Sequence, residues 1–553
     1  MTQVKSPLLF WLAVLVLLAP PGSPGLASPA AETSVYLPLV LRPSEEQAVQ
    51  APTLKWQRGG CYSSWCETGW YSSPAVADLD GDGAPEVIGS AYSIVVLDGA
   101  TGALVWRAPS GHDRSDPGAS SVGRTWPGIV AADLQADGDL EIVTAHGGGY
   151  VAVYDSNGFF EPGWPQRPTG GQELRGLSVS DLDGDENMEV IVTGAVTAPA
   201  NTWVYSATGV LLPGWPQLSD DSGYAHGVFN ANAAAGDLDG DGELELVVPS
   251  DVHYIAAYEP DGSQIPAHPM YGGKGWGKVG AWESPEIELR GWGTCDSADD
   301  RAERYRANFA HGAAAIADVD GNGALEVVVS GNMYDCAGAS YPSQYTALFI
   351  FNADRSRFVS GPYDWSVPAV DTGAPLSEDY GLIENAQPNP VPVDLDGDGK
   401  MEILFASYDG RLHAFWLDRS EHGSWPFQVY DPSKSFLRFA SEPAVADLNG
   451  DGRAEVIFAS WVEKGSSATG KLHVLDYLGN PLHEVDLPPA FSGNWNGALA
   501  APTLANIDGD PDLEVVLNTA ASGLVAYDLP GTAGARVLWG TGRGDQHRDG
   551  LTP

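Results

Sequence analysis

Basic residues are scarce in this sequence, and the motifs of common catalytic sites are missing. Of 553 residues, 28 are Lys or Arg and 73 are Asp or Glu, which gives a formal net charge of −45. Such a charge repels phosphates, so we expect no nucleic-acid partner. The sequence contains no G-x-S-x-G, H-E-x-x-H, P-loop or C-x-x-C motif. No catalytic residue is therefore predicted, and a non-enzymatic role is favoured while enzymatic activity is left undecided.

Long hydrophobic runs are also missing beyond the N-terminus. Residues 8–18 form an apolar run behind Lys5, and small residues surround Ala27 and Ala30. This is the pattern of a secretory signal peptide, and the run is shorter than the roughly 20 residues that a membrane span needs. We expect a signal peptide at 1–27, a linker at 28–53 and no membrane span after cleavage. The mature protein is then secreted, either extracellular or at the cell surface.

Cysteine is rare, with four residues in the whole chain. An even, small number in an exported protein predicts two disulfides. Four cysteines allow three connectivities, of which the local one is preferred. That connectivity pairs Cys61 with Cys66 and Cys295 with Cys336.

Acidic residues, in contrast, recur at fixed spacing in eight copies of a nine-residue pattern, D-x-D-x-D-G-x-x-E. Asp, Asn or Glu stands at positions 1, 3, 5 and 9 of every copy, except that Gln135 takes position 3 of the second copy. The candidate metal ligands are Asp78, Asp80, Asp82 and Glu86; Asp133, Asp137 and Glu141; Asp181, Asp183, Asp185 and Glu189; Asp237, Asp239, Asp241 and Glu245; Asp318, Asp320, Asn322 and Glu326; Asp394, Asp396, Asp398 and Glu402; Asp447, Asn449, Asp451 and Glu455; and Asn506, Asp508, Asp510 and Glu514.

The residues around each acidic loop predict a four-stranded antiparallel unit. A small apolar run precedes the loop, a β-branched run follows it, and two further runs come after, the last often carrying Trp. Such units bury both faces when they pack radially, so we predict an all-β, eight-bladed β-propeller over 54–553. Seven blades, with one repeat displaced, is the alternative. Either residues 54–57 or residues 537–540 would supply the outer strand that closes the ring.

The acidic loops have the chemistry of calcium sites. Gly at positions 4 and 6 permits a tight turn that gathers the carboxylates, and hard oxygen ligands at this density suit Ca²⁺. We therefore predict several bound Ca²⁺ ions. An EF-hand is excluded, because its loop needs a Glu at position 12 and flanking helices.

These units resemble the FG-GAP/VCBS repeat, the calcium hairpin that is also found in integrin α-subunit propellers. The resemblance covers roughly residues 71–530 and implies that positions 1, 3, 5 and 9 bind metal through their side chains. It also implies weaker binding where the pattern changes, at Gln135, Glu186 and Asn506. A weaker similarity connects the chain to rhamnogalacturonan lyase propellers, which have similar calcium loops.

The strand order predicts where a ligand binds. The acidic loops join the first and second strands of every blade at one face, so the residues just before each inner strand gather around the channel at the other face. Large polar or aromatic residues occupy these positions: Trp70, Trp126, Arg175, His226, His311, Glu384, Glu442 and Trp495. Such a surface would stack on sugars and form hydrogen bonds with them. An insert at 271–308 is expected to lie over the same mouth.

Two functions from different classes fit these features. The favoured hypothesis is a monomeric extracellular binding or adhesion module for a glycan or a surface protein. The alternative is a polysaccharide lyase of the rhamnogalacturonan-lyase type. The tripeptide Arg543-Gly544-Asp545, which integrins read, lies in a C-terminal tail that we expect to finish the ring.

Overall fold

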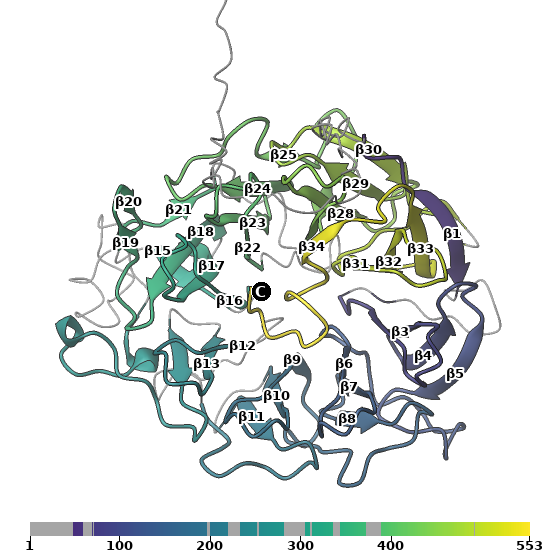
Figure 1. The fold of residues 1–553 in the computed structure, drawn as a ribbon, viewed down its shortest axis with the longest axis horizontal. Helices are drawn as coiled ribbons and strands as arrows, with labels where there is room; N and C mark the ends of the chain where they lie inside the picture. The colour runs from purple at the N-terminus through teal and green to yellow at the C-terminus, as the bar shows by residue number, and fades with distance from the viewer. Residues whose placement is uncertain are drawn as a thin grey trace, which may run out of the picture. The chain divides into compact units, whose positions relative to one another are not determined.

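Eight small antiparallel sheets surround a central channel in the computed structural model (Figure 1). The structure describes residues 48–58, 69, 71–195, 200–218, 233–250, 254–280, 305–309, 312–335, 343–371, 389–490 and 493–552. They belong to one compact unit, Glu46–Pro553. Each sheet is one blade, so the predicted eight-bladed propeller is confirmed and the seven-bladed alternative is wrong.

The first four blades follow each other along the chain. Blade 1 contains β2 (Ala75–Ala77), β3 (Glu86–Ser90), β4 (Ser93–Asp98) and β5 (Leu104–Pro109). Blade 2 contains β6 (Val130–Ala132), β7 (Glu141–Ala145) and β8 (Val151–Tyr154), and blade 3 contains β9 (Leu174–Ser180), β10 (Glu189–Gly194) and β11 (Thr202–Tyr205). Blade 4 contains β12 (Ala234–Gly236), β13 (Glu245–Pro249) and β14 (Ile255–Tyr258), and isolated bridges stand for the fourth strand in blades 2 to 4.

The next four blades are more elaborate. Blade 5 contains β15 (Tyr305–Asn308), β16 (Ala314–Ala317), β17 (Glu326–Asp335), β18 (Ser343–Asn352) and β21 (Ala369–Val370), beside a hairpin of β19 (Val359–Ser360) and β20 (Tyr363–Asp364). Blade 6 contains β22 (Val391–Val393), β23 (Glu402–Ala406), β24 (Arg411–Phe415) and β25 (Phe427–Gln428). Blade 7 contains β26 (Arg438–Ala440), β27 (Ala444–Asp447), β28 (Glu455–Val462), β29 (Lys471–Leu475) and β30 (Pro481–Asp486), and blade 8 contains β31 (Thr503–Ala505), β32 (Leu513–Thr519) and β33 (Gly523–Leu529).

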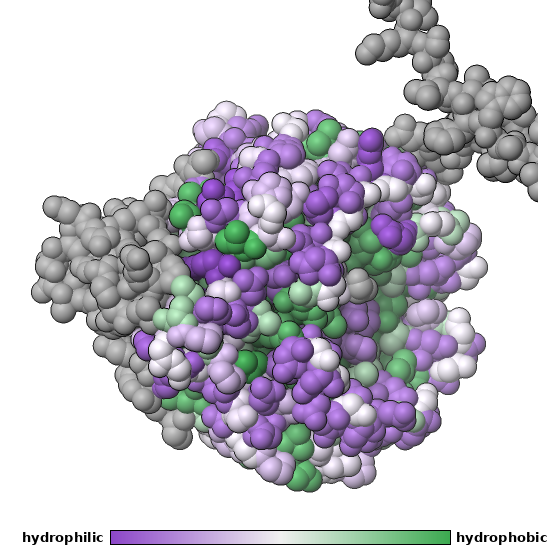
Figure 2. Space-filling view, turned by 60° about the vertical axis from the view of Figure 1, so that its left-hand side comes forward, coloured by the Kyte–Doolittle hydropathy of each residue, from purple (hydrophilic) through white to green (hydrophobic). Residues whose placement is uncertain are grey.

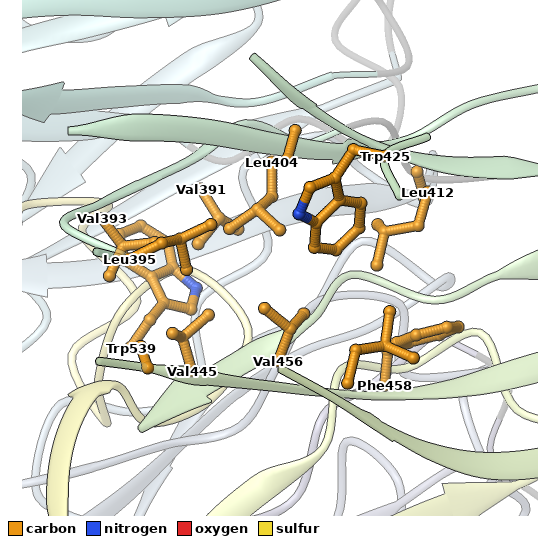
Figure 3. Close-up of a cluster of buried hydrophobic side chains, with 14 of the residues drawn as sticks. Val391, Val393, Leu395, Leu404, Leu412, Trp425, Val445, Val456, Phe458 and Trp539 are labelled. Atoms are coloured by element: carbon orange, nitrogen blue, oxygen red, sulfur yellow. The ribbon is translucent and has the colours of Figure 1, made fainter. Parts of the chain in front are cut away.

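Neighbouring blades bury apolar side chains between their faces. Between blades 6 and 7, Val391 and Leu404 face Val456 and Phe458, and Trp539 closes the inner end of the cluster (Figure 3). The β-branched and aromatic residues of the second and third strands supply these contacts, because they fit a pleated surface that is covered on both sides. Each fully buried Val, Leu or Phe contributes about 1.5–3 kcal/mol.

The N-terminal strand β1 (Thr53–Arg58) closes the ring. It is the outer strand of blade 8 and pairs antiparallel with β33. The predicted closing strand at 54–57 is therefore confirmed. The Nε1–H of Trp56 in this strand donates to the carbonyl of Gly99 in blade 1 at 2.7 Å, so β1 joins the last blade to the first.

Tryptophans of the outer strands clamp successive blades together. In seven of the eight blade pairs, a Trp Nε1–H donates to a carbonyl of the next blade over 2.7–3.0 Å. The clamping residues are Trp56, Trp106, Trp164, Trp215, Trp276, Trp365 and Trp425. Between blades 7 and 8, the hydroxyl of Tyr527 donates to Asp486 O at 3.3 Å. This geometry explains why Trp recurs in the fourth strand of the repeat.

The C-terminal tail fills the channel (Figure 1). Strand β34 (Arg536–Trp539) pairs with the inner strand β27, so residues 537–540 do not supply the outer strand. Beyond it, backbone atoms of residues 540–550 bond the inner strands of blades 8, 3, 4 and 5. Arg548 donates to Ile129 O of blade 2 (3.0 Å) and Pro74 O of blade 1 (2.8 Å), and Thr552 donates to Pro392 O of blade 6 (3.3 Å). The tail thus contacts all eight blades.

Several sequence features lie partly or wholly outside the described residues, including the signal peptide, the four cysteines and residues 281–304 of the insert. Residues 271–280 of the insert pack into the ring instead, where Trp276 is fully buried. No described helix has the length and apolar character of a membrane span. The surface shown in Figure 2 is predominantly hydrophilic, with hydrophobic side chains in small patches.

Candidate functional site

The acidic loops share one backbone-bonded geometry at the face of the ring that we call the loop face. In the first loop, Asp82 N–H and Gly83 N–H donate to Oδ1 and Oδ2 of Asp78 at 3.0 and 2.9 Å. Leu79 N–H donates to Oε2 of Glu86 at 2.9 Å. The same three bonds recur in the second to seventh loops. They fix positions 1 and 9 so that their carboxylates face position 3.

Carboxylates of the same loop come close together in at least four of the loops. In four loops, three carboxylates have an oxygen within 4.8 Å of each of the other two. These sets are Asp78, Asp80 and Asp82; Asp181, Asp183 and Glu189; Asp237, Asp239 and Glu245; and Asp318, Asp320 and Glu326. Oε1 of Glu245 and Oδ1 of Asp320 are buried and have no hydrogen-bond partner. Buried, unpartnered anionic oxygens are costly, so these loops fit a hard divalent cation.

Burial raises the pKa of the glutamate at position 9, and the neighbouring carboxylates add to the shift, although a backbone hydrogen bond opposes it. The pKa rises to about 9 for Glu402. It rises to about 7 for Glu141, Glu189, Glu245, Glu326 and Glu455. Without a compensating cation, these groups are therefore partly protonated near neutral pH.

Three loops depart from the common pattern. In the second, the amide nitrogen of Gln135, turned toward Glu141, donates to its Oε2 at 2.7 Å, in place of a carboxylate ligand. In the third, Glu186 takes the left-handed conformation (φ 74°) where six other loops have Gly and the eighth has Pro511, at a cost of about 1–2 kcal/mol. In the eighth, Lys55 of β1 pairs with Asp508 and with Glu514, the latter at 2.9 Å.

Three of the predicted ligand residues meet at the opposite face, which we call the mouth face. Trp126, Arg175 and Glu442 line one pocket, although they come from three blades. The other lining residues are Tyr71, Ser73, Pro127, Gly128, Asn389, Gly542 and Arg543. The last two belong to the tail, which therefore forms part of the pocket wall.

Trp126 forms the aromatic wall of this mouth pocket. The guanidinium of Arg175 lies 3.5 Å from its ring centroid, that of Arg124 lies 4.9 Å away, and the Tyr71 ring packs at 5.1 Å. Nε1 of Trp126 is buried and has no hydrogen-bond partner. Arg175 also pairs with Glu173, whose side chain is 41% exposed. The wall is a half-buried indole between two cations, in a protein that is otherwise strongly acidic.

The position of Trp126 is set by a buried pair behind it. Oγ1 of Thr125 lies 2.9 Å from Nδ1 of His146, and Oγ1 of Thr144 lies 2.8 Å from Nε2. Burial, with a smaller contribution from His112, lowers the pKa of His146 to about 3. His146 is therefore neutral and serves as a positioning group.

Glu442 has a structural role in the pocket. It is 2% exposed, and it accepts bonds from Arg543 N–H (2.7 Å), Trp539 Nε1–H (3.3 Å) and Asn389 Nδ2 (2.7 Å). Its carboxylate holds the tail to blades 6 and 7. Arg543 is itself 4% exposed, so the tripeptide at 543–545 presents Asp545 at the surface but not the side chain of Arg543.

Trp495 packs beside the mouth pocket. It donates from Nε1 to Val462 O and Glu463 O at 3.2 and 3.1 Å and packs edge-on against Trp461 at 5.4 Å. One aromatic cluster contains both tryptophans together with Tyr71 and Trp126. The other predicted ligand residues, Trp70, His226, His311 and Glu384, lie outside the described residues.

A second buried polar network lies at the mouth end of blade 6. Nε2 of His413 lies 3.3 Å from Asp409 Oδ2, and its Nδ1 lies 3.0 Å from Glu421 Oε1. Burial lowers the pKa of His413, but these two carboxylates outweigh burial and raise it to about 9. The nearby carboxyl of Asp371 accepts from Ser407, and burial raises its pKa to about 6. The protonated imidazole of His413 therefore has a carboxylate partner at each ring nitrogen, and the network has a structural role.

Sequence reasoning missed four residues that complete these sites. Tyr71 adjoins the predicted Trp70, and Asn389 precedes an inner strand, so the strand-entry pattern could have found both. Arg543 and Lys55 reach their partners from segments more than 100 and 450 residues away. No local signal in the sequence marks these two.

The chain shows similarity to known repeat proteins. Residues 133–192 and 394–458 match the FG-GAP-like repeat, which includes the second, third, sixth and seventh acidic loops. Human cartilage acidic protein 1 is 22% identical over 415 residues, covering 71% of this chain and 56% of the relative. Rhamnogalacturonan endolyase YesW of Bacillus subtilis (strain 168) is 24% identical over 310 residues, covering 48% of this chain and 43% of the relative. The chain thus spans about half the length of these curated relatives.

Solved structures with similar folds include enzymes and a designed protein. The exotype rhamnogalacturonan lyase YesX aligns with a TM-score of 0.46 at 16% identity, over 86% of this chain and 75% of that chain. The computationally designed protein Ika8 aligns with a TM-score of 0.43 at 12% identity, over 84% of this chain and 98% of that chain.

Proposed function

Because the chain is an eight-bladed propeller that contains FG-GAP-like repeats, we propose that it is a secreted, calcium-holding module that binds a glycan at the mouth face. The signal-like N-terminus supports export. The observation that most directly supports this proposal is that Trp126, Arg175 and Tyr71 meet at one pocket, where a half-buried indole lies between two arginines.

Calcium has a structural role in this proposal. The side chains at positions 1, 3, 5 and 9 of the regular loops would hold the ion, in the loops that begin at residues 78, 181, 237, 318, 394 and 447. Unpartnered buried oxygens in two of these loops, and the raised pKa of the position 9 glutamates, support this role. The bound cation offsets the repulsion between carboxylates where the first and second strands of each blade meet.

The mouth pocket would bind the glycan mainly by hydrogen bonding. Hydroxyl or carboxylate oxygens of a sugar would accept N–H bonds from Arg175 and Arg124, whose guanidinium groups lie against the indole of Trp126. The arginines favour an acidic saccharide, because the guanidinium fork matches a carboxylate. Trp495 and Trp461 extend the aromatic surface beside the pocket.

A glycan array tests this function. The folded chain is screened in calcium buffer against neutral and uronate-containing oligosaccharides, and the hits are measured by isothermal titration. Trp126→Ala is expected to weaken binding by about 10- to 100-fold. Phe159→Ala is the matched control, because Phe159 is exposed and has Arg114 above its ring at 5.7 Å. It lies at the loop-face end of blade 2. Equal loss in both variants, or binding only to proteins, contradicts the proposal.

A polysaccharide lyase is the second candidate, because one curated relative is a rhamnogalacturonan endolyase. A lyase needs a base that removes the proton α to a uronate carboxyl group. Among the described lining residues of the mouth pocket, the one carboxylate is Glu442, which already accepts three hydrogen bonds. We therefore favour binding. Release of an unsaturated uronate product from rhamnogalacturonan, followed by its absorbance, would reverse this preference.

A further inference from the structure

The eighth acidic loop receives a side chain at positions where the fourth and fifth loops have unpartnered oxygens. Nζ of Lys55 contacts Oδ2 of Asp508 and lies 2.9 Å from Oε1 of Glu514. The Lys55 side chain is 17% exposed, and that of Glu514 is fully buried. The ammonium group therefore lies inside the loop, between the carboxylates of positions 3 and 9.

Lys55 contacts carboxylates at the two loop positions, 3 and 9, that have unpartnered oxygens in other loops. Asp320 is position 3 of the fifth loop, and its Oδ1 has no partner. Glu245 is position 9 of the fourth loop, and its Oε1 has no partner. In the eighth loop, positions 3 and 9 are satisfied by Lys55, so the place of a metal cation is taken by an ammonium group.

The backbone of β1 directs Lys55 into the loop. The pairing of β1 with β33 shifts register between Leu54 and Trp56, so Lys55 is the extra residue of a β-bulge. A bulge re-aims a side chain out of the regular alternation of a strand. Lys55 thus points into the eighth loop while Trp56 reaches Gly99 of blade 1.

The first position of the eighth loop is also altered. Asn506 stands where all seven other loops have an Asp whose two oxygens both accept backbone N–H groups, as in the sixth loop. Its Nδ2 instead donates to the carbonyl of Asp510. An amide nitrogen is not a calcium ligand. The eighth loop therefore combines a neutral residue at position 1 with an internal cation.

We propose that Lys55 is the built-in cation of the eighth loop, which holds no calcium while the regular loops do. This inference rests on the proposed calcium loading of those loops. Its consequence is that the ring closes without metal: the strand that joins the first and last blades is held by a covalently attached ammonium group.

Calcium counts in variants test this assignment. Each folded protein is equilibrated with calcium, desalted, and its metal content measured by mass spectrometry. Lys55→Met is expected to bind one more ion than the wild type. Lys400→Met is the matched control, because Lys400, at position 7 of the sixth loop, also pairs with a loop carboxylate, Asp398 at 3.0 Å, but its side chain is 34% exposed, twice as much as that of Lys55. It should leave the count unchanged. An unchanged count in Lys55→Met overturns the inference.

A second pair of variants leaves Lys55 in place, in case its replacement prevents folding. Asp508→Ala removes the side-chain ligand at position 3 of the eighth loop and is expected to leave the calcium count of the wild type unchanged. Asp396→Ala removes the side-chain ligand at position 3 of the sixth loop and is expected to lower the count by one. A drop in the count of Asp508→Ala overturns the role of Lys55 alone. Absence of calcium from every protein overturns the calcium proposal and this inference together.

Discussion

The two ends of the channel are built on different principles. At the loop face, seven loops share the same three backbone bonds, and seven tryptophan clamps end on carbonyls at the same end of successive blades. At the mouth face, five of the blades contribute five different residues to one pocket: Tyr71, Trp126, Arg175, Asn389 and Glu442.

This difference separates scaffold from recognition surface. A bond that recurs in every blade stabilises each blade in the same way, and its loss at several places would open the ring. A set of unlike residues at one point does not stabilise every blade in the same way. It does offer aromatic surface, positive charge and hydrogen bonds to one ligand. We therefore place stability at the loop face and binding at the mouth, with Glu442 as the exception.

Removal of calcium would have the largest effect on this comparison. Each occupied loop stabilises the fold by about 2.7 kcal/mol when free calcium is 100 times its Kd. Exhaustive chelation should therefore lower the Tm by more than about 10 °C, measured by circular dichroism. Restored calcium should recover the Tm, and magnesium at equal concentration serves as the control. An identical melting curve after chelation would contradict the stabilising role of calcium at the loop face.

Glu442→Ala would show that one mouth residue belongs to the scaffold. The change leaves Arg543 N–H, Trp539 Nε1–H and the Asn389 amide without their acceptor. We expect the free energy of unfolding, measured with urea, to fall by about 3–5 kcal/mol. The control is Glu173→Ala, at an exposed carboxylate of the same face, which should cost less than about 0.5 kcal/mol. Equal costs would mean that Glu442 does not anchor the tail.

His413 should make stability depend on pH at the mouth end of blade 6. Its pKa is about 9 in the folded protein and 6.5 as the ordinary value, with Asp409, Glu421 and Asp371 around it. Because the pKa of His413 is raised in the folded protein, its protonation stabilises the fold fully below pH 6.5. This stabilisation is lost as the pH rises through 9. The free energy of unfolding should fall by about 3 kcal/mol across that window. In His413→Gln this fall should disappear; a wild-type curve that is flat there would contradict the assignment.

Two Trp→Phe changes would give the smallest and sharpest comparison. Trp164→Phe removes the Nε1–H bond to Ala207 O at 2.8 Å, and should cost about 1 kcal/mol of unfolding free energy. Trp126→Phe removes an Nε1–H that has no partner, and should cost less than about 0.5 kcal/mol. The urea midpoints of the two variants measure these losses of unfolding free energy. If Trp126→Phe costs more, the indole of the mouth pocket is part of the scaffold.

The acidic loops made much of the fold predictable. Their spacing and their flanking runs predicted eight blades, and the run at 54–57 predicted the closing strand. Both predictions are confirmed. They succeeded because a loop of nine residues and the hairpin around it are local structures, whose Gly, Asp and β-branched residues have fixed conformational preferences.

The candidate site was predictable only in outline. The rule that residues before inner strands gather at the mouth placed Trp126, Arg175 and Glu442 together, and the structure brings these three to one pocket. Their role in ligand binding stays a prediction. The rule could not show that Glu442 forms hydrogen bonds with the tail, because its partner Arg543 lies 101 residues away in the sequence.

By itself, the sequence determined the repeat, the number of blades and the chemistry of the loops, since each depends on residues within one hairpin. Only the tertiary structure decided that the tail fills the channel, that Glu442 anchors it and that Lys55 enters the eighth loop. The last contact joins residues 459 positions apart. Closing the ring brings the N-terminal strand to the last blade, and no local pattern encodes which side chain then meets an unsatisfied carboxylate.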